Sequence, residues 1–563
     1  MTDASSSNQR LSEEHRRHGT VKETLTSLVI AFIMAFVFRA FVLEAFLIPT
    51  GSMAPTLLGA HMRIHSDQTG SNWSVGPWYY ADDARQLPLP RQGTTAAPVV
   101  VHDPITGPPY DGIELRRVGE KRLAGDRIFV LKYLYSIFDP ERFDVVVFKN
   151  PTLPTENYIK RLIGLPGEQV ALIDGDVFRR DAGEVRDGEP NAWSGPGWTI
   201  QRKTESVLRA CWNTVFDSSF APRGSVRGFR PPWRGEGPGW SIDQRTSYLY
   251  EGDAPTALNW NHVVWPVTDY IGYNEIGLSE NQRKEPLPVS DVRLAAGVKP
   301  EGEGMSVRIV VRTRGHAFAA EIEGSRARLT MTPLNDPGAV TVLDEAELPA
   351  SALASGRVTN LELWHADQAL WLFVDDELVA GGREEGAYDW TPRQRVEFST
   401  GNSLEFMSED GSGFSDTPIN KFADAAYFKA PELAWEFGGG NFELFRVRLD
   451  KDLHYRAEEY PRAGPGSTPH ARRGLHPVAV HPTSSPVLGP DQFFVCGDNS
   501  AYSLDGRLWD RADPWVRDAF EHADIGVVPR ELLIGKAFFV YFPAIQSRGM
   551  IPVPDFGRLR FIW

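Results

Sequence analysis

The most apolar part of the chain lies near its start. Residues 25–38 carry no charge, and hydrophobic character resumes after Arg39 and continues past Glu44 to residue 48. A hydrocarbon core of about 30 Å takes roughly 20 helical residues. The segment 25–48 is therefore long enough to span a bilayer if the charged ends of Arg39 and Glu44 reach the membrane–water interface. The pattern predicts a transmembrane anchor over 25–48.

Two other interpretations of this apolar segment fit less well. A cleaved signal peptide needs small residues at its exit site, and residues 46–49 offer none. A buried amphipathic helix needs a polar face, and 25–38 is apolar on nearly all faces. Basic residues such as Arg17 and Lys22 precede the segment. We therefore expect 1–24 to form a cytoplasmic tail and the bulk of the chain to lie outside the cytoplasm.

Strict alternation of apolar and polar residues marks the middle of the chain. It runs through 305–312 and 445–450, and an alternating segment at 370–374 is followed by Asp375-Asp376 and a further apolar pair, as in a hairpin. Several antiparallel strands with polar turns predict an inserted β-sandwich. We place it within 181–460, and its pattern loosely resembles a laminin-G or concanavalin-like jelly roll.

Composition narrows the possible functions. The chain has 563 residues, which predicts two or three domains, and its net charge of −15 disfavours nucleic acid as a partner. Only Cys211 and Cys496 occur, and no CxxC pair exists, so a zinc ribbon or iron–sulfur site is disfavoured. Two free thiols are favoured over a disulfide between these distant positions. No metal or cofactor is predicted.

One serine and one lysine are candidates for catalysis. Ser52 lies in a Pro/Gly turn directly after the apolar segment, and a serine hydroxyl needs a base to become a nucleophile. No histidine stands in a recognisable catalytic frame. Lys160 lies among apolar neighbours in a predicted strand, and burial would lower its pKa and supply a neutral amine. A lone strand lysine is more often a surface charge, so the residues by themselves leave both interpretations open.

Four stretches in order resemble the bacterial type I signal peptidases. They are the serine turn 48–57, residues 125–130, the lysine strand with its following turn at 157–168, and 497–507. The resemblance implies a mainly β catalytic core, of barrel or sheet form, after one transmembrane helix. The core would comprise 49–62, 120–180 and 485–563. A loop-rich insertion at 63–119, the sandwich at 181–460 and a linker at 461–484 would interrupt it.

The resemblance also implies a role for each site residue. Ser52 would be the nucleophile and Lys160 the general base, while the Ser52 amide and the Thr50 hydroxyl would hold the oxyanion. The supporting residues would be Ser503, which bonds the lysine, the ion pair Asp505–Arg507, Gly497, where a side chain would crowd the lysine, and Asp498, which ties the turn. Two positions depart from the family pattern. Ser500 stands where arginine is common, and Gly506 stands where serine is common.

The expected activity is that of a signal peptidase I. Such an enzyme removes signal peptides from exported preproteins at the outer face of the cytoplasmic membrane, so preproteins and phospholipid would be its partners. A self-cleaving repressor would use the same dyad, but no DNA-binding helix-turn-helix pattern is visible. A surface protein with a relict core, whose sandwich binds glycan or protein, is the remaining alternative.

Overall fold

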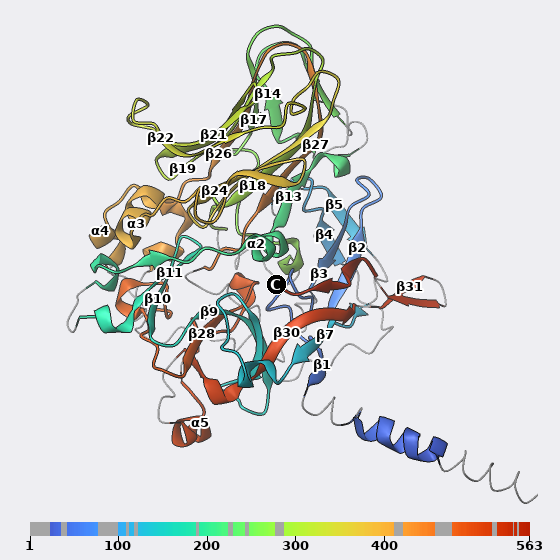
Figure 1. Ribbon diagram of the computed structural model, residues 1–563, viewed down its shortest axis with the longest axis vertical. Coiled ribbons are helices and arrows are strands. Elements are labelled where there is room, and N and C mark those ends of the chain that lie inside the picture. Colours follow the sequence, from blue (N-terminus) through green and yellow to red (C-terminus); the bar gives the residue numbers. More distant parts are fainter. Residues whose placement is uncertain are drawn as a thin grey trace, which may run out of the picture.

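A computed structural model describes most of the chain. The described residues are 23–34, 36, 42–76, 99–108, 112–117, 122–186, 191–222, 229–242, 247–275, 286–409, 420–456, 476–509, 511–520, 526–543, 545–548, 551–554 and 556–563. They form a mainly β structure in which a two-sheet lobe lies above a second β lobe that contains the chain's early and late segments (Figure 1). The prediction of a mainly β protein is confirmed.

The lower lobe is organised by an antiparallel sheet of eight strands assembled from three distant parts of the chain. Three valines and a phenylalanine make up most of β8, which suits a strand buried on both faces, and most of β9 is buried as well. Along the sheet the strands are β1 (Leu43–Leu47), β7 (Arg127–Leu131), β30 (Leu533–Phe542), β8 (Val145–Lys149), β9 (Asn157–Gly164), β28 (Gln492–Cys496) and β29 (Val527–Pro529), with β33 (Arg560–Phe561) paired to β30.

The predicted anchor is only partly helical. Residues 23–34 are helical, but Leu43–Leu47 form β1, which pairs with β7 from Leu43↔Leu131 to Leu47↔Arg127. The prediction of an anchor that reaches residue 48 is therefore wrong at its carboxyl end. Pairing with β7 satisfies the backbone there, and Glu44 forms an ion pair with Lys132 at 3.1 Å. Within the described residues, no helix has both the length and the apolar character needed to cross a membrane.

The first insertion has more regular structure than its composition predicts. The predicted loop-rich segment 63–119 contains β3 (Asn72–Val75), β4 (Val99–His102), β5 (Glu114–Arg117) and most of β2 (His61–His65), and β6 (Arg122–Leu123) follows. Sheets β3-β2-β6 and β4-β5 pack around buried Met62, Ile64 and Val101. The segment forms short strands despite its many turn-forming residues, because the strands bury apolar side chains on one face. Residues 77–98 of the segment lie outside the described part.

A small sheet leads from the core into the second insertion. It consists of β10 (Glu168–Ile173), β11 (Asp176–Asp181) and β12 (Thr199–Ile200). The predicted sandwich boundary at residue 181 therefore cuts through this sheet, because β12 joins the edge of the β10–β11 hairpin. The short helix α2 (Glu205–Cys211) follows, and Thr204 caps its first turn.

The predicted sandwich is present as two antiparallel sheets between residues 213 and 451. Alternating side chains of both sheets meet in one large apolar core that contains Leu294, Ile309, Leu372 and Val447. One sheet has the order β15 (Trp240–Ser241), β16 (Ser247–Tyr250), β27 (Phe442–Lys451), β18 (Val292–Pro300), β23 (Thr359–Ala366), β24 (Ala369–Val374) and β25 (Glu377–Gly381), with β13 (Asn213–Asp217) paired to β27. The other has the order β14 (Trp233–Gly235), β17 (Thr256–Trp260), β26 (Glu432–Gly438), β19 (Ser306–Thr313), β20 (His316–Glu323), β21 (Arg326–Pro333) and β22 (Thr341–Glu347).

The connections around these sheets are short helices and a packed return segment. The remaining α-helices are α3 (Pro392–Thr400), α4 (Leu404–Ser408) and α5 (Pro514–Ala519), and β31 (Ile545–Arg548) pairs with β32 (Ile551–Pro554) near the end. Residues 461–475 of the predicted linker 461–484 lie outside the described part of the chain. From residue 476 it is not a free linker, because Ala479 is fully buried and bonds Leu172, and Val478 bonds Arg507.

Candidate active site

Ser52 lies in a tight turn directly after β1. The Ile48 amide donates to the Asp126 carbonyl at 2.9 Å, which fixes the start of the turn. Within it the Ala54 amide donates to the Gly51 carbonyl at 3.0 Å, and Met53 is fully buried. The buried apolar side chains hold the turn against the core and leave Ser52 about 9% exposed.

Lys160 lies on the central strand β9 and reaches this turn. Its Nζ donates to Ser52 Oγ at 2.8 Å and to the Ile159 carbonyl at 3.0 Å. The lysine is 3% exposed. The predicted serine and lysine are thus in direct hydrogen-bond contact although 108 positions separate them in the chain.

Burial lowers the pKa of the Lys160 amine from 10.5 to about 8. The nearby carboxylates Asp505 and Asp498 act in the opposite direction but do not outweigh the loss of hydration. A measurable fraction of the amine is therefore neutral near pH 7. A neutral amine 2.8 Å from a serine hydroxyl can accept its proton.

Arg161 and Asp498 form a buried pair behind the lysine. Successive side chains of a strand point to opposite faces, so Arg161 points away from Ser52. Its Nε and Nη2 donate to the two Asp498 oxygens at 2.8 and 2.7 Å, and neither side chain is exposed. Asp498 was expected to tie its own turn through backbone hydrogen bonds; in the described residues both of its oxygens accept from Arg161 instead. Sequence analysis assigned Arg161 no role.

The segment 497–507 forms the wall beside the lysine. Asp505 and Arg507 make a buried ion pair at 2.8 Å, and the Gly497 amide donates to the same carboxylate at 2.8 Å. Burial raises the pKa of Asp505, but Arg507 and these hydrogen bonds hold it below its usual value. Arg507 also donates to Ser500 Oγ at 2.7 Å. The unusual Ser500 is therefore part of the same network.

Gly497 and Ser503 lie close to the dyad in a different arrangement from the predicted one. A Cβ at position 497 would lie 2.2 Å from Ser503 Oγ and 2.5 Å from the Ser52 carbonyl oxygen, so it would crowd these atoms first. Ser503 is fully buried, and its hydroxyl interacts with the Asp505 carboxylate and helps to lower the pKa of that group. The predicted bond from Ser503 to Lys160 is absent.

Two further candidate positions complete the site. Thr50 is exposed, two residues before Ser52. Asn499 is buried and makes two hydrogen bonds to the serine turn. Its backbone N–H donates to the Ser52 carbonyl at 3.0 Å, and its side-chain Nδ2 donates to the Gly51 carbonyl at 2.9 Å. No motif indicated that Asn274, in the second insertion, also contacts Asn499.

Comparison with known proteins agrees with this arrangement. The family model described as "Signal peptidase, peptidase S26" matches residues 21–89 and 118–187, which include both Ser52 and Lys160. The matches support a type I signal peptidase-like family for these segments of the chain. The wall 497–507 lies outside the matched residues, and its Asn499 backbone N–H donates to the Ser52 carbonyl.

Curated relatives and solved structures cover different shares of the chain. Signal peptidase I of Rickettsia bellii (strain OSU 85-389) is 27% identical over 168 residues, which is 30% of this chain and 43% of the relative. Signal peptidase I of Rickettsia typhi is 29% identical over 163 residues, or 29% and 44% of the two chains. The chain thus spans less than half the length of these relatives. A carbohydrate-binding module of Bacillus subtilis is 10% identical over 39% of this chain and 96% of its own, with a TM-score of 0.22, too low to support any argument.

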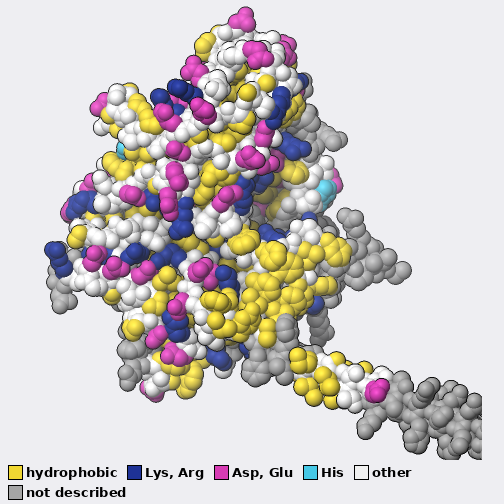
Figure 2. Space-filling model, viewed as in Figure 1, with side chains coloured by type: hydrophobic (Ala, Val, Ile, Leu, Met, Phe, Trp, Pro, Cys, Tyr) yellow, Lys and Arg dark blue, Asp and Glu magenta, His cyan; other side chains and the backbone are white. Residues whose placement is uncertain are grey.

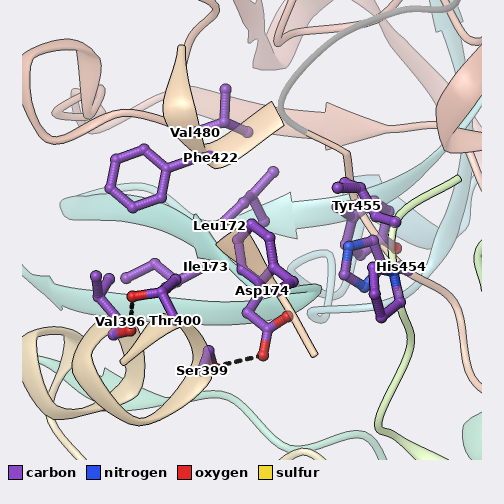
Figure 3. A pocket seen from close by; sticks show the side chains of 13 residues that line it. Leu172, Ile173, Asp174, Val396, Ser399, Thr400, Phe422, His454, Tyr455 and Val480 are labelled. Carbon is purple, nitrogen blue, oxygen red and sulfur yellow. Dashed lines mark hydrogen bonds between the residues drawn. The ribbon is translucent and has the colours of Figure 1, made fainter. Parts of the chain in front are cut away.

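A small cavity lies elsewhere, between the β10–β11 turn and α3 (Figure 3). Asp174 points into it and accepts from Ser399 Oγ at 2.7 Å, with His454 on the opposite side. Its volume of about 20 Å³ has room for a single water. None of the side chains that line it belongs to the dyad or to the wall 497–507. The cavity is too small to be a substrate site.

Proposed function

We propose that the chain is a serine endopeptidase that removes signal peptides from exported preproteins. The observation that carries this proposal is the buried contact between Lys160 Nζ and Ser52 Oγ. A lysine whose pKa is lowered to about 8 by burial can serve as the base that a serine nucleophile needs.

The proposed reaction has two stages. Neutral Lys160 takes the proton of Ser52 as Oγ attacks the scissile carbonyl, and the Ser52 amide and Thr50 hydroxyl stabilise the oxyanion. The lysine proton passes to the leaving amine, the C–N bond breaks, and an ester forms on Ser52. Lys160 then takes a proton from water, the hydroxide attacks the ester, and Ser52 regains its proton as the acid product leaves.

The surroundings of the dyad suit small apolar residues next to the scissile bond. Buried Ile48, Met53, Leu57 and Ile159 belong to one apolar cluster at the serine turn. An apolar cluster beside the dyad favours a substrate whose side chains are short and uncharged near the scissile bond. Signal peptides of exported preproteins have that character, since their cleavage sites carry small residues.

Exposed apolar surface supports contact with a phospholipid membrane. On helix 23–34 the side chains of Leu25, Phe32 and Met34 are more than half exposed. Beside it Figure 2 shows an extended hydrophobic surface on the lower lobe. Exposed Phe561 and Trp563 near β33 add to the apolar surface of this lobe. Contiguous apolar surface of this kind marks a membrane or protein contact. A single-pass topology with a cytoplasmic amino end remains a prediction from the sequence.

Cleavage of a preprotein by the full chain in detergent tests the proposal. Ser52→Ala and Lys160→Met should each abolish cleavage. Ser218→Ala and Lys421→Met are matched controls, because both residues are buried but lie in the second insertion outside the site. Full activity of either dyad variant would refute the mechanism.

A further inference from the structure

The second insertion touches the serine turn through a short segment between β17 and β18. The 3₁₀ turn η6 (Gly272–Asn274) carries two buried side chains, Tyr273 and Asn274, toward the core. The Tyr273 hydroxyl donates to the Ala60 carbonyl at 2.9 Å, just after the serine turn. Its ring lies over Gly51, where an added Cβ would be 2.2 Å from Tyr273 Cε1. The insertion therefore packs directly against the residue that precedes the nucleophile.

Asn274 and Asn499 form a reciprocal amide pair. Asn274 Nδ2 donates to Asn499 Oδ1 at 2.7 Å, and Asn499 Nδ2 donates to Asn274 Oδ1 at 2.8 Å. Asn274 is 3% exposed and Asn499 is 1% exposed. Because each amide offers both a donor and an acceptor, the pair occupies the Asn499 oxygen and one of its two N–H groups, and so holds the Asn499 side chain in place.

That orientation matters because Asn499 Nδ2 also donates to the Gly51 carbonyl at 2.9 Å. If the Asn499 amide were reversed, its oxygen would face the Gly51 carbonyl oxygen and the contact would become repulsive. The Gly51 carbonyl thus sets the orientation of the Asn499 amide, and Asn274 immobilises the amide in that orientation through two hydrogen bonds.

The Gly51 carbonyl lies in the same peptide group as the Ser52 N–H. A trans peptide is planar, and its C=O and N–H point in opposite directions. The Gly51 carbonyl also accepts from the Ala54 N–H at 3.0 Å, so Asn499 and Ala54 together set the direction of the Ser52 N–H, the donor proposed to bind the oxyanion. The backbone N–H of Asn499 donates to the next carbonyl, that of Ser52, at 3.0 Å. Both peptide groups that flank the nucleophile are thus fixed through Asn499.

The segment that carries Asn274 is itself fastened to the sandwich. Lys451, the last residue of β27, donates to the Thr268 and Tyr270 carbonyls. Asp269 forms a buried ion pair with Arg456 at 2.6 Å. The amide pair therefore links a rigid sheet of the insertion to the catalytic turn.

We propose that Asn274 is a positioning residue, which orients the oxyanion-binding amide of Ser52 through Asn499. This inference rests on the proposed function and assigns the second insertion a part in it. The loss of correct orientation should lower kcat without weakening substrate binding, since the interaction is made in the transition state.

The test compares full-length Asn274→Leu with Asn420→Leu. Asn420 is a matched control, because it is a buried asparagine of the insertion that caps η8 (Lys421–Ala423) away from the site. Asn274→Leu should lower kcat about 10- to 100-fold with little change in KM. Hydrogen exchange of the peptide that contains Ser52 should become faster. Equal kcat and equal exchange in the two variants would overturn the inference.

Asn274→Asp gives a second readout that does not depend on how well the leucine variant folds. An ionised carboxylate has no proton to donate to Asn499 Oδ1, whereas a protonated carboxyl has one. The kcat of Asn274→Asp relative to the wild type should therefore rise as the pH falls. A flat ratio would contradict the positioning role. If the wild-type chain cleaves no preprotein, the proposed function fails, while hydrogen exchange at the Ser52 turn still tests the inference.

Discussion

Arg161 and Asp498 face each other in a two-pronged ion pair, and each directly adjoins a residue of the candidate active site. Arg161 follows Lys160 in β9, and Asp498 follows Gly497 in the wall. The guanidinium also donates to the Phe143 carbonyl at 2.9 Å. The pair therefore joins β9, which carries Lys160, to the segment 497–507 that follows β28.

Removing one member of this pair should be costly. Asp498→Leu leaves the buried Arg161 charge without its partner, so we expect the free energy of unfolding to fall by about 3–5 kcal/mol. Denaturant unfolding measures the change. Arg328→Leu is the control, because Arg328 and Glu345 form an exposed pair worth about 1 kcal/mol or less. A similarly small loss for Asp498→Leu would contradict the role assigned to the pair.

Gly497→Ala should impair catalysis by displacing the Ser52 backbone. The added Cβ would lie 2.5 Å from the Ser52 carbonyl oxygen, so this oxygen or the wall must move. A displacement approaching 1 Å at a catalytic group costs about 100-fold in rate. Steady-state kinetics of Gly497→Ala and Gly302→Ala provide the comparison, since a Cβ at Gly302 meets no atom within 4 Å. Equal rates would show that the site tolerates the side chain.

The rate should increase with pH around the pKa of Lys160. The base must be neutral, and burial lowers its pKa from 10.5 to about 8. A plot of kcat/KM against pH should therefore rise to a plateau with a midpoint near 8. A midpoint near 10.5 would mean that the lysine is not desolvated in the free enzyme. A midpoint near 6.5 would indicate a histidine base instead.

Lys160→Met should stabilise the protein at low pH. The folded-state pKa of Lys160 lies below its unfolded value, so the unfolded chain binds more protons between pH 8 and 10.5. The cost of burying this group is therefore present in full below pH 8 and is lost as the pH rises to 10.5. The gain in thermal midpoint for Lys160→Met should be largest near pH 7 and decline above pH 8. Lys149→Met, at an exposed site on β8, should show no such trend.

Local patterns located several strands of the sandwich, whereas the pairing of Ser52 with Lys160 was expected only from the family resemblance. The alternation at 305–312 predicted β19, and that at 370–374 with its polar turn predicted the β24–β25 hairpin. The turn around Ser52 and the apolar strand around Lys160 each carry their own signal. Their direct contact depends on the path of the turn after β1, which brings Ser52 to Lys160 on β9.

Long-range polar pairing could not be inferred in the same way. Arg161 pairs with a residue 337 positions away, and Asn274 with one 225 positions away. Neither residue stands in a local pattern that names its partner. Ser503 illustrates the same limit. The resemblance implied a hydrogen bond from Ser503 to Lys160, but the partner of the Ser503 hydroxyl depends on side-chain directions that the packing of 497–507 sets.

Trapping the ester on Ser52 tests the central claim most directly. Full-length protein is mixed with a preprotein, quenched in acid within a single turnover, digested and examined by mass spectrometry. We predict a signal peptide esterified to Ser52 in the wild type, none in Ser52→Ala, and a greatly slowed appearance in Lys160→Met. Cleavage without an adduct on Ser52, or an adduct that forms as fast in Lys160→Met as in the wild type, would contradict the Ser52–Lys160 mechanism.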